Sequence, residues 1–227
     1  MLYLTDERLA RIPGVVHGFG TAALDENGLR ALARLSDFDP ILLDQVHSDV
    51  VHIIEEIPPE RPQGDASVTG VPGLLLVVKT ADCLPLLLCD ERLRVVAAVH
   101  AGWKGTRSGI IRAALRAMNE RFGTDPADII AAAGPCIGPA CYEVGEDVRS
   151  EYLSAGFPAR FFAPAGRPGK YFLDLRSANF EELRSAGVPL PDRAETAPCT
   201  HCDPDFHSWR RDRDTSRRMF SFIGLLD

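Results

Sequence analysis

Three side chains in this sequence could together hold a metal ion. His47, Cys83 and His100 each lie next to a short apolar run, and such runs predict strands. Two imidazoles and one thiolate suit Zn²⁺, and three protein ligands leave a fourth position for water or substrate. Ligands scattered along a chain carry no motif. The alternative is therefore that the histidines are hydrogen-bonded core residues and that Cys83 packs as a small apolar residue.

Two carboxylates are candidates for general acid–base chemistry. Asp82 directly precedes Cys83, and Asp65 precedes another predicted buried segment. A carboxylate in such a place could accept the second ring N–H of a ligand histidine or take a proton from a nucleophile. Aspartate is also common in turns for its backbone hydrogen bonding alone, so both interpretations stay open.

Four cations could bind an anion such as phosphate. Lys104 and Arg107 lie in residues 101–109, a glycine-rich segment predicted to be a turn before a helix, and helix starts favour anions. Arg210 and Arg211 follow Trp209 and could contact phosphate or purine. Solvated surface cations would explain the same pattern.

The remaining cysteines form two further patterns. Cys141 and Glu143, with Cys199 and Cys202, match C-x-E and P-C-x-x-C, the signature of the zinc nucleobase deaminases. That site needs both halves at helix starts, whereas the second half here runs into Asp-Pro, which breaks a helix. Cys199, Cys202 and His207 would supply only part of a structural zinc site. We therefore expect these cysteines to be buried beside a loop.

Composition narrows the class of protein. The chain has 227 residues and a net charge of -7, which argues against nucleic-acid binding and gives no basic stripe for a membrane surface. No apolar run is long enough to span a membrane, and the first residues lack the apolar segment of a signal peptide. Six cysteines without an export signal are expected to be reduced. These features favour a cytoplasmic protein.

The apolar pattern predicts one α/β domain over residues 1–227, with helix and sheet layers around a single core. Short apolar runs predict strands at residues 15–19, 41–43, 50–55, 74–78, 84–88, 95–99, 129–133, 171–173 and 219–223. Helical spacing predicts helices at residues 25–36, 108–122, 146–155 and 174–186.

Several segments together resemble the polyphenol-oxidase or laccase-domain family, whose members are described as purine nucleoside phosphorylases with adenosine deaminase activity. They are QVHSDVV, GDASVT, TADCLPLLLCD, VHAGWKGTRSGI, GPCIGPACYEVG and CTHCDPDFHSWRRD with RMFSFIGL, and the resemblance covers residues 40–227. In that family the residues matching His47, Cys83 and His100 are zinc ligands. The resemblance also implies a four-layer α-β-β-α sandwich related to a bacterial toxin deamidase.

The function implied by this resemblance is zinc-dependent phosphorolysis. Adenosine, inosine, guanosine and methylthioadenosine would yield the free base and ribose 1-phosphate or methylthioribose 1-phosphate, with phosphate held near Lys104 and Arg107. Adenosine would also be deaminated to inosine by a zinc-activated water. Copper could replace zinc, but six histidines, at positions 17, 47, 52, 100, 201 and 207, are too few for a multicopper laccase centre.

The N-terminal part departs from the family pattern, and two other functions remain open. Family members typically show HGFSTR and a Gly-rich loop, whereas this chain has His17-Gly-Phe-Gly-Thr-Ala, with Ala22 in place of the arginine. One alternative is a cysteine hydrolase or amidase, for example in cell-wall precursor editing, with Cys83 as nucleophile and His100 as base. The other is a non-catalytic module that binds a metal or a partner.

Overall fold

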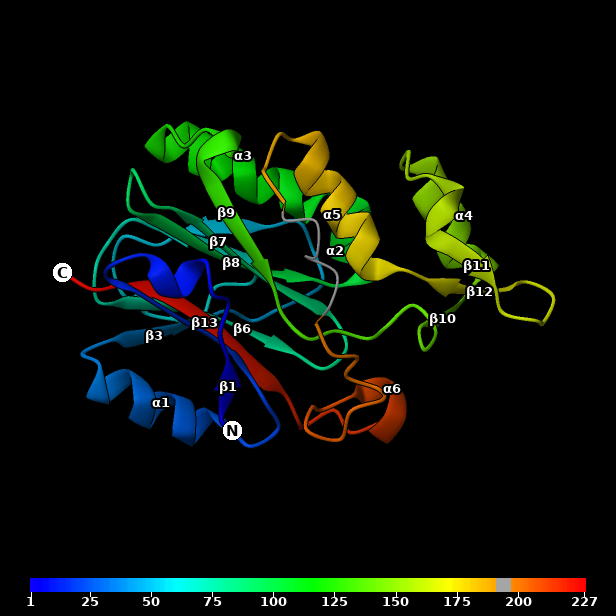
Figure 1. The fold of residues 1–227 in the computed structure, drawn as a ribbon, viewed down its shortest axis with the longest axis horizontal. Coiled ribbons are helices and arrows are strands. Elements are labelled where there is room, and N and C mark those ends of the chain that lie inside the picture. Colours follow the sequence, from blue (N-terminus) through cyan, green and yellow to red (C-terminus); the bar gives the residue numbers. More distant parts are fainter. Residues whose placement is uncertain (191–196) are drawn as a thin grey trace.

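Two five-stranded sheets stack face to face at the centre of the molecule (Figure 1). The computed structural model describes residues 1–190 and 197–227. The first sheet has the order β1 (Tyr3–Leu4), β2 (Val15–Gly20), β13 (Met219–Leu225), β6 (Leu74–Thr80) and β3 (Asp39–Leu42). The second has the order β4 (Val51–Ile53), β5 (Ala66–Thr69), β8 (Val95–Ala101), β7 (Leu84–Asp90) and β9 (Ile129–Ala133).

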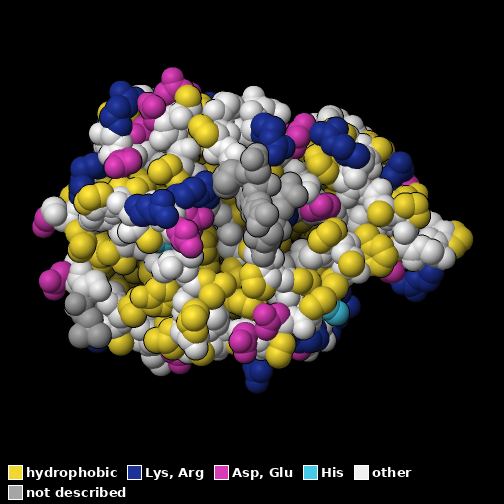
Figure 2. Space-filling model, viewed as in Figure 1, with side chains coloured by type: hydrophobic (Ala, Val, Ile, Leu, Met, Phe, Trp, Pro, Cys, Tyr) yellow, Lys and Arg dark blue, Asp and Glu magenta, His cyan; other side chains and the backbone are white. Residues whose placement is uncertain are grey.

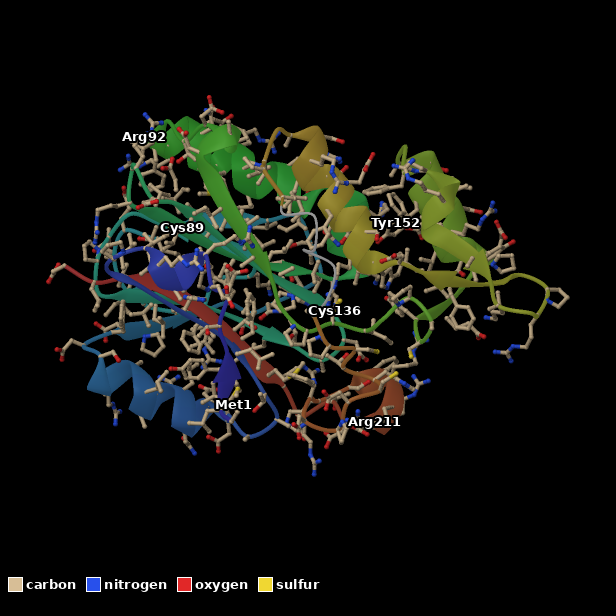
Figure 3. All side chains as sticks on the ribbon, in the orientation of Figure 1. Met1, Cys89, Arg92, Cys136, Tyr152 and Arg211 are labelled. Atoms are coloured by element: carbon tan, nitrogen blue, oxygen red, sulfur yellow. The ribbon has the colours of Figure 1, made fainter. Side chains whose placement is uncertain are left out.

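The apolar strands β7 and β8 are buried on both faces. Successive side chains of a strand point to opposite sides. Leu86 and Leu88 therefore belong to a core beneath helices, whereas Leu87 and Cys89 join Val96 in the core between the two sheets. Cys89 is labelled at this position in Figure 3. A continuous apolar run, rather than an alternating one, is what such a doubly covered strand requires.

Helices cover the outer faces of both sheets. The helix α1 (Glu26–Leu35) packs Leu29 against Phe222 and Val77 of the first sheet. The helices α2 (Trp103–Ser108), α3 (Ile110–Phe122) and α5 (Leu175–Ser185) cover the second sheet. Figure 1 shows the resulting order of helix, sheet, sheet and helix. The predicted four-layer α/β arrangement is confirmed.

Smaller elements extend the molecule beside these layers (Figure 1). A third sheet has the order β10 (Glu143–Gly145), β12 (Lys170–Leu173) and β11 (Phe162–Pro164), and it lies beside α4 (Glu146–Ser154). The short helices are η1 (Leu9–Arg11), η2 (Pro126–Asp128), η3 (Ala159–Phe161) and α6 (Trp209–Asp212). Tyr152 of α4, labelled in Figure 3, is fully buried against Phe157 and Phe162.

The turn predicted over residues 101–109 is wrong. The structure forms the helix α2 there, in which the Thr106 N–H donates to the Gly102 carbonyl (2.8 Å). Gly109 has a φ of 90°, a left-handed conformation that glycine adopts without steric cost, and this residue separates α2 from α3. Glycine spacing alone did not reveal that six residues between Gly102 and Gly109 suffice for a helical turn.

Charges of both signs are interspersed on the face seen in Figure 2. Arg112 of α3 pairs with Glu182 of α5, and Arg160 pairs with Glu181 of the same helix. Within the described residues, no helix has the length and apolar character needed to cross a membrane.

Candidate metal centre

His47, Cys83 and His100 converge from three separate segments. His47 lies in the loop between β3 and β4, Cys83 in the turn between β6 and β7, and His100 within β8. Their ligand atoms all lie within 4.8 Å of one another. Cys83 Sγ is 3.9 Å from His47 Nε2, and the two imidazole centroids are 4.8 Å apart. The spacing in sequence gave no sign of this convergence, which depends on strand order in the two sheets.

Asp65 positions both histidines. Its Oδ1 lies 2.7 Å from His100 Nδ1, so that the imidazole donates this N–H and keeps Nε2 for a ligand. The same carboxylate accepts the His47 N–H (3.0 Å) and both the N–H and the hydroxyl of Ser48 (2.6 and 2.7 Å). These bonds hold the loop in which His47 adopts a φ of 61°. Asp65 is completely buried, so it acts on the histidines from within the core.

Gly102 leaves the space in which two of the three side chains meet. A Cβ atom at this position would lie 2.9 Å from His47 Cδ2 and 3.0 Å from Cys83 Sγ. Real Cβ atoms rarely approach that closely, so any other residue would push the ring or the sulfur away. The glycine immediately after the β8 strand is therefore part of the site for steric reasons.

The charges of the three groups depend on one another. Burial acts to raise the pKa of Cys83, but the neighbouring His100 and His47 lower it to about 6. Burial acts to lower the pKa of His100, but Cys83 and the hydrogen bond that His100 donates to Asp65 raise it to about 9. The pKa of Asp65 lies well below its usual range, because hydrogen bonds from His100 and Ser48 outweigh burial. The site thus favours a thiolate, which is the form of cysteine that binds metals and attacks electrophiles.

Asp82 lies at the edge of the same site but faces the C-terminal loop. Its φ is 88°, and both carboxylate oxygens accept hydrogen bonds. Oδ1 accepts from the Thr200 hydroxyl (2.7 Å), and Oδ2 accepts from the Arg210 N–H (2.6 Å). The carboxylate therefore ties the turn that carries Cys83 to residues 200–210.

A cavity of about 460 Å³ opens over His47, Cys83 and His100. Its aromatic lining consists of Trp103, Tyr142 and Trp209. Its basic lining consists of Lys79, Arg210 and Arg218, and Gln45, Ala81 and Asp82 complete the wall with the three candidate ligands. A cavity with flat rings, cations and a potential metal site has the features of a small-molecule site.

Of the four cations predicted to contact phosphate, Arg210 lines this cavity. Arg210 Nη1 donates to the Glu143 carbonyl (2.7 Å), and its guanidinium stacks 5.1 Å from the Tyr142 ring centroid. Within residues 1–190 and 197–227, its buried Nε has no hydrogen-bond partner. A buried N–H without an acceptor is costly unless a ligand supplies one.

The other three predicted cations lie elsewhere. Lys104 sits over the ring of Trp103, Arg107 pairs with Glu151, and neither is among the described residues that line the cavity. Arg211, labelled in Figure 3, donates to the carbonyls of Thr200 and Phe206 and so braces its own loop. The expectation of a phosphate site at residues 101–109 assumed a turn, and α2 instead directs these side chains outward. Lys79 and Arg218 were not identified as cavity residues from the sequence. Their only signal in the sequence is position, because Lys79 lies near the end of β6 and Arg218 directly precedes β13.

The cysteines expected to lie buried beside a loop form a second cluster instead. Cys141, His201 and Cys202 place their ligand atoms within 4.8 Å of one another, and the two sulfur atoms are 3.3 Å apart. Neither half of the deaminase-like pattern begins a helix, because β10 follows Cys141 and a turn contains Cys202. The deaminase geometry is therefore absent at these described residues, although both halves meet in space. His207 is not a member of this cluster.

Comparison with known proteins assigns the chain to a family. The profile of the family described as multi-copper polyphenol oxidoreductase laccase matches residues 21–226. The chain belongs to this family. Its similarity extends to a Deinococcus radiodurans protein named purine nucleoside phosphorylase, which is 42% identical over 202 residues, covering 88% of this chain and 76% of the relative. The protein of Escherichia coli named purine nucleoside phosphorylase YfiH is 36% identical over 190 residues, covering 82% of this chain and 74% of the relative.

Solved structures of the family share the fold. YlmD from Geobacillus stearothermophilus superposes with a TM-score of 0.83 at 28% identity, covering 100% of this chain and 99% of that one. YfiH of Bacillus licheniformis gives the same TM-score at 29% identity, with 93% and 92% covered. The family resemblance stated from sequence motifs is confirmed by these comparisons.

The N-terminal departure from the family pattern lies away from the metal cluster. Ala22 lines a different cavity, together with Thr21 and Phe206, and its N–H donates to the Asp205 carbonyl (2.8 Å). Ala22 therefore lies beside the C-terminal loop and is not among the described residues that line the cavity above His47, Cys83 and His100.

Proposed function

We propose that this protein is a zinc-dependent enzyme that acts on purine nucleosides at the cavity above His47, Cys83 and His100. The observation that carries the proposal is the convergence of two imidazoles and a thiol of lowered pKa beneath aromatic rings and the Arg210 guanidinium, whose buried Nε has no hydrogen-bond partner among the described residues. Relatives named purine nucleoside phosphorylase support the substrate class. The reactions proposed are phosphorolysis of adenosine, inosine, guanosine and methylthioadenosine, and deamination of adenosine to inosine.

The donor set fits zinc. One thiolate and two neutral imidazoles are typical ligands of Zn²⁺, and Asp65 fixes the ring orientation of His100 in the manner common to zinc-bound histidines. A zinc ion held by three protein ligands keeps one position open and supplies Lewis-acid chemistry, including a lowered pKa of a bound water. Copper is the alternative metal, because the same soft and imidazole donors also bind it.

The walls of the cavity suit the two parts of a nucleoside reaction. Trp103, Tyr142 and Trp209 offer flat apolar faces, on which a purine ring can stack. Arg210 offers an Nε–H that has no acceptor in the part of the chain that the structure describes, and a guanidinium binds phosphate oxygens through directed hydrogen bonds. We assign the base to the aromatic side and phosphate to the side of Arg210, with Lys79 and Arg218 as further cations.

We assign Asp65 and Asp82 to positioning rather than to direct proton transfer. Asp65 is buried behind His100 and already accepts several hydrogen bonds. Asp82 lines the cavity, yet both of its oxygens are engaged by Thr200 and Arg210. Through these bonds, Asp82 would fix the main chain of Arg210 relative to Cys83 and so set the distance between phosphate and metal.

A turnover screen tests this function. Zinc-loaded protein would be incubated with inosine and phosphate, and with adenosine alone, and the free base, ribose 1-phosphate and inosine would be measured. The proposal expects phosphate-dependent release of hypoxanthine in the first assay and inosine in the second. Absence of both products from folded, zinc-loaded protein would refute it.

A cysteine hydrolase remains the second candidate, because Cys83 has a pKa lowered to about 6 beside His100. This alternative needs no metal, so amide hydrolysis by chelator-treated protein and its loss on alkylation of Cys83 would favour it. A non-catalytic module is disfavoured, since structural zinc is usually enclosed by four protein ligands. Survival of the biological role in a His47→Ala protein would favour that alternative.

A laccase activity does not suit the histidines of this chain. His17 accepts the Asp6 N–H, His52 bonds the Gln63 carbonyl, and only His47 and His100 of the described histidines share a cluster. A multicopper centre needs many more imidazoles in one place. We also propose that the reaction occurs in the cytoplasm, because free thiols in metal-type clusters persist in a reducing compartment.

A further inference from the structure

We propose that Cys141, His201 and Cys202, completed by Cys199, form a second metal site that takes Zn²⁺ and stabilises the wall of the cavity. The sequence pattern C-T-H-C supplies three of these residues, and the segment after β9 supplies Cys141. The site lies outside the His47 cluster and takes no part in the chemistry proposed there. It is a structural site, with four protein ligands and no position for substrate.

The distances suit a soft metal ion. Tetrahedral zinc with bonds of about 2.3 Å to sulfur requires sulfur atoms roughly 3.8 Å apart. The Cys141 and Cys202 sulfur atoms are 3.3 Å apart, and the ligand nitrogen of His201 lies within 4.8 Å of both. Small side-chain rotations would therefore bring all three donors to bonding distance without moving the main chain.

Cys199 is prepared to act as a fourth ligand. Its sulfur accepts the Gly138 N–H (3.0 Å) and the N–H groups of His201 and Cys202, and it also interacts with the Cys141 thiol. A Cβ at Gly138 would lie 3.1 Å from this sulfur, so glycine is needed for the approach.

The cluster joins two segments that build the cavity. Cys136 and Cys199 form an isolated parallel bridge, and the Thr200 N–H donates to the Cys136 carbonyl (3.1 Å). Tyr142, which lines the cavity, directly follows Cys141. Thr200, which holds Asp82, lies between Cys199 and His201. A metal ion here would therefore fix the ring of Tyr142 and the Asp82 contact at the same time.

A disulfide between Cys141 and Cys202 is the rival outcome. It would use only two of the three donors that lie within 4.8 Å of one another and would leave out His201. Bond formation would also require the two sulfur atoms to approach to about 2.05 Å and an oxidant to accept two electrons. The presence of the imidazole beside the two thiols favours a metal ion.

The test uses full-length protein stripped of metal, fully reduced and reloaded with Zn²⁺, with the bound zinc counted by mass spectrometry of the metal. We expect two zinc ions per chain in the parent protein, one in Cys83→Ser and one in Cys202→Ser. One zinc ion in the parent protein and none in Cys83→Ser would overturn the proposal. An intact mass lower by two hydrogen atoms after purification under reducing conditions would overturn it in favour of the disulfide.

Cobalt provides a second measurement that does not depend on the stability of a cluster variant. Co²⁺ added to metal-free Cys83→Ser protein is expected to give the near-ultraviolet absorption of a cobalt–thiolate bond, because only the second cluster retains thiolate ligands. Absence of this absorption in folded Cys83→Ser protein would contradict the proposal. Cys89→Ala is the matched control, since Cys89 lies between the sheets and its removal is expected to leave both zinc ions in place.

Discussion

The two cysteine–histidine clusters differ in how they are built. His47, Cys83 and His100 come from three segments at the edge of the stacked sheets, with a buried carboxylate behind them and a cavity in front. The second cluster comes from two irregular segments, and Cys202 is exposed. The first has three donors and an open side, whereas the second has three donors with the Cys199 thiol beside them. Surroundings, rather than residue type, separate the open site from the closed one that we propose.

One carboxylate links the two regions. Asp82 precedes Cys83 and accepts hydrogen bonds from Thr200 and Arg210. Thr200 lies inside the C-T-H-C segment of the second cluster, and Arg210 lines the cavity. The structural cluster is therefore expected to tune substrate binding without supplying a reacting group.

The largest difference between the clusters should appear when the open one loses its thiol. Cys83→Ser is expected to lower phosphorolysis by at least about 100-fold, because a zinc ligand is lost at the reacting centre. Steady-state assays with inosine and phosphate, at matched concentrations of folded protein, measure this effect. Retention of more than a tenth of the activity would place the reaction elsewhere.

Replacement of the carboxylate behind the open cluster should have the next largest effect. Asp65→Asn is expected to reduce zinc affinity or activity by about 10- to 100-fold. An amide has one accepting oxygen in place of two, so asparagine cannot accept the hydrogen bonds of both His100 and Ser48. Competition with a zinc chelator measures the affinity. An unchanged zinc affinity and activity would show that Asp65 does not position the histidines.

The effect of removing a cation that lines the cavity can be compared with the effect of removing one outside it. Arg210→Ala is expected to raise the KM for phosphate by about tenfold, the loss of one charge-assisted hydrogen bond. Arg107→Ala is the control, because Arg107 pairs with Glu151 outside the cavity. Equal effects of the two substitutions would contradict the placement of phosphate beside Arg210.

A smaller effect is expected when the structural cluster is altered. Cys202→Ser should raise the KM for nucleoside by about threefold while one zinc ion remains. Loss of the second metal ion would make the adjoining cavity wall less rigid, and we expect this to weaken the free energy of nucleoside binding by under about 1 kcal/mol. Kinetics and zinc content measured on the same sample test this. A loss of activity as large as that of Cys83→Ser would mean that the second cluster takes part in the chemistry.

A buried histidine outside both clusters should make the stability of the fold depend on pH. Burial lowers the pKa of His17, whose Nε2 accepts the Asp6 N–H. The resulting stability is fully present above the ordinary histidine pKa of about 6.5 and is lost as the pH falls below it. Urea unfolding on both sides of this pH should show a lower stability at the acidic side, and His17→Gln should reduce this difference. An identical pH dependence in the variant would assign the change to other groups.

Much of the fold could be predicted because each layer leaves a pattern in the sequence. The uninterrupted apolar runs of β7 and β8 reflect burial on both faces, and Asp25 and Asp174, at the starts of the predicted helices, cap α1 and α5. The short helix α2 was missed, since its glycines resembled those of a turn.

The site was only partly predictable. The three candidate ligands were identified by residue type and family resemblance, but their convergence depends on strand order, which local sequence does not encode. Lys104 and Arg107 were assigned to phosphate from the glycine pattern, whereas Arg210 and the missed Arg218 line the cavity. The contact between Cys141 and Cys202 joins residues 61 positions apart, and its only signal in sequence was the C-x-E and P-C-x-x-C pattern.

The assignment of nucleoside chemistry to a zinc ion at His47, Cys83 and His100 can be tested by adding zinc back to metal-free Cys202→Ser protein. The phosphate-dependent release of hypoxanthine from inosine is followed during the addition. We predict no release before zinc is added, and a rate of release that increases until one zinc ion is bound per chain. Full activity of the metal-free protein, or no activity after zinc is bound, would contradict the assignment of nucleoside chemistry to the His47, Cys83 and His100 cluster.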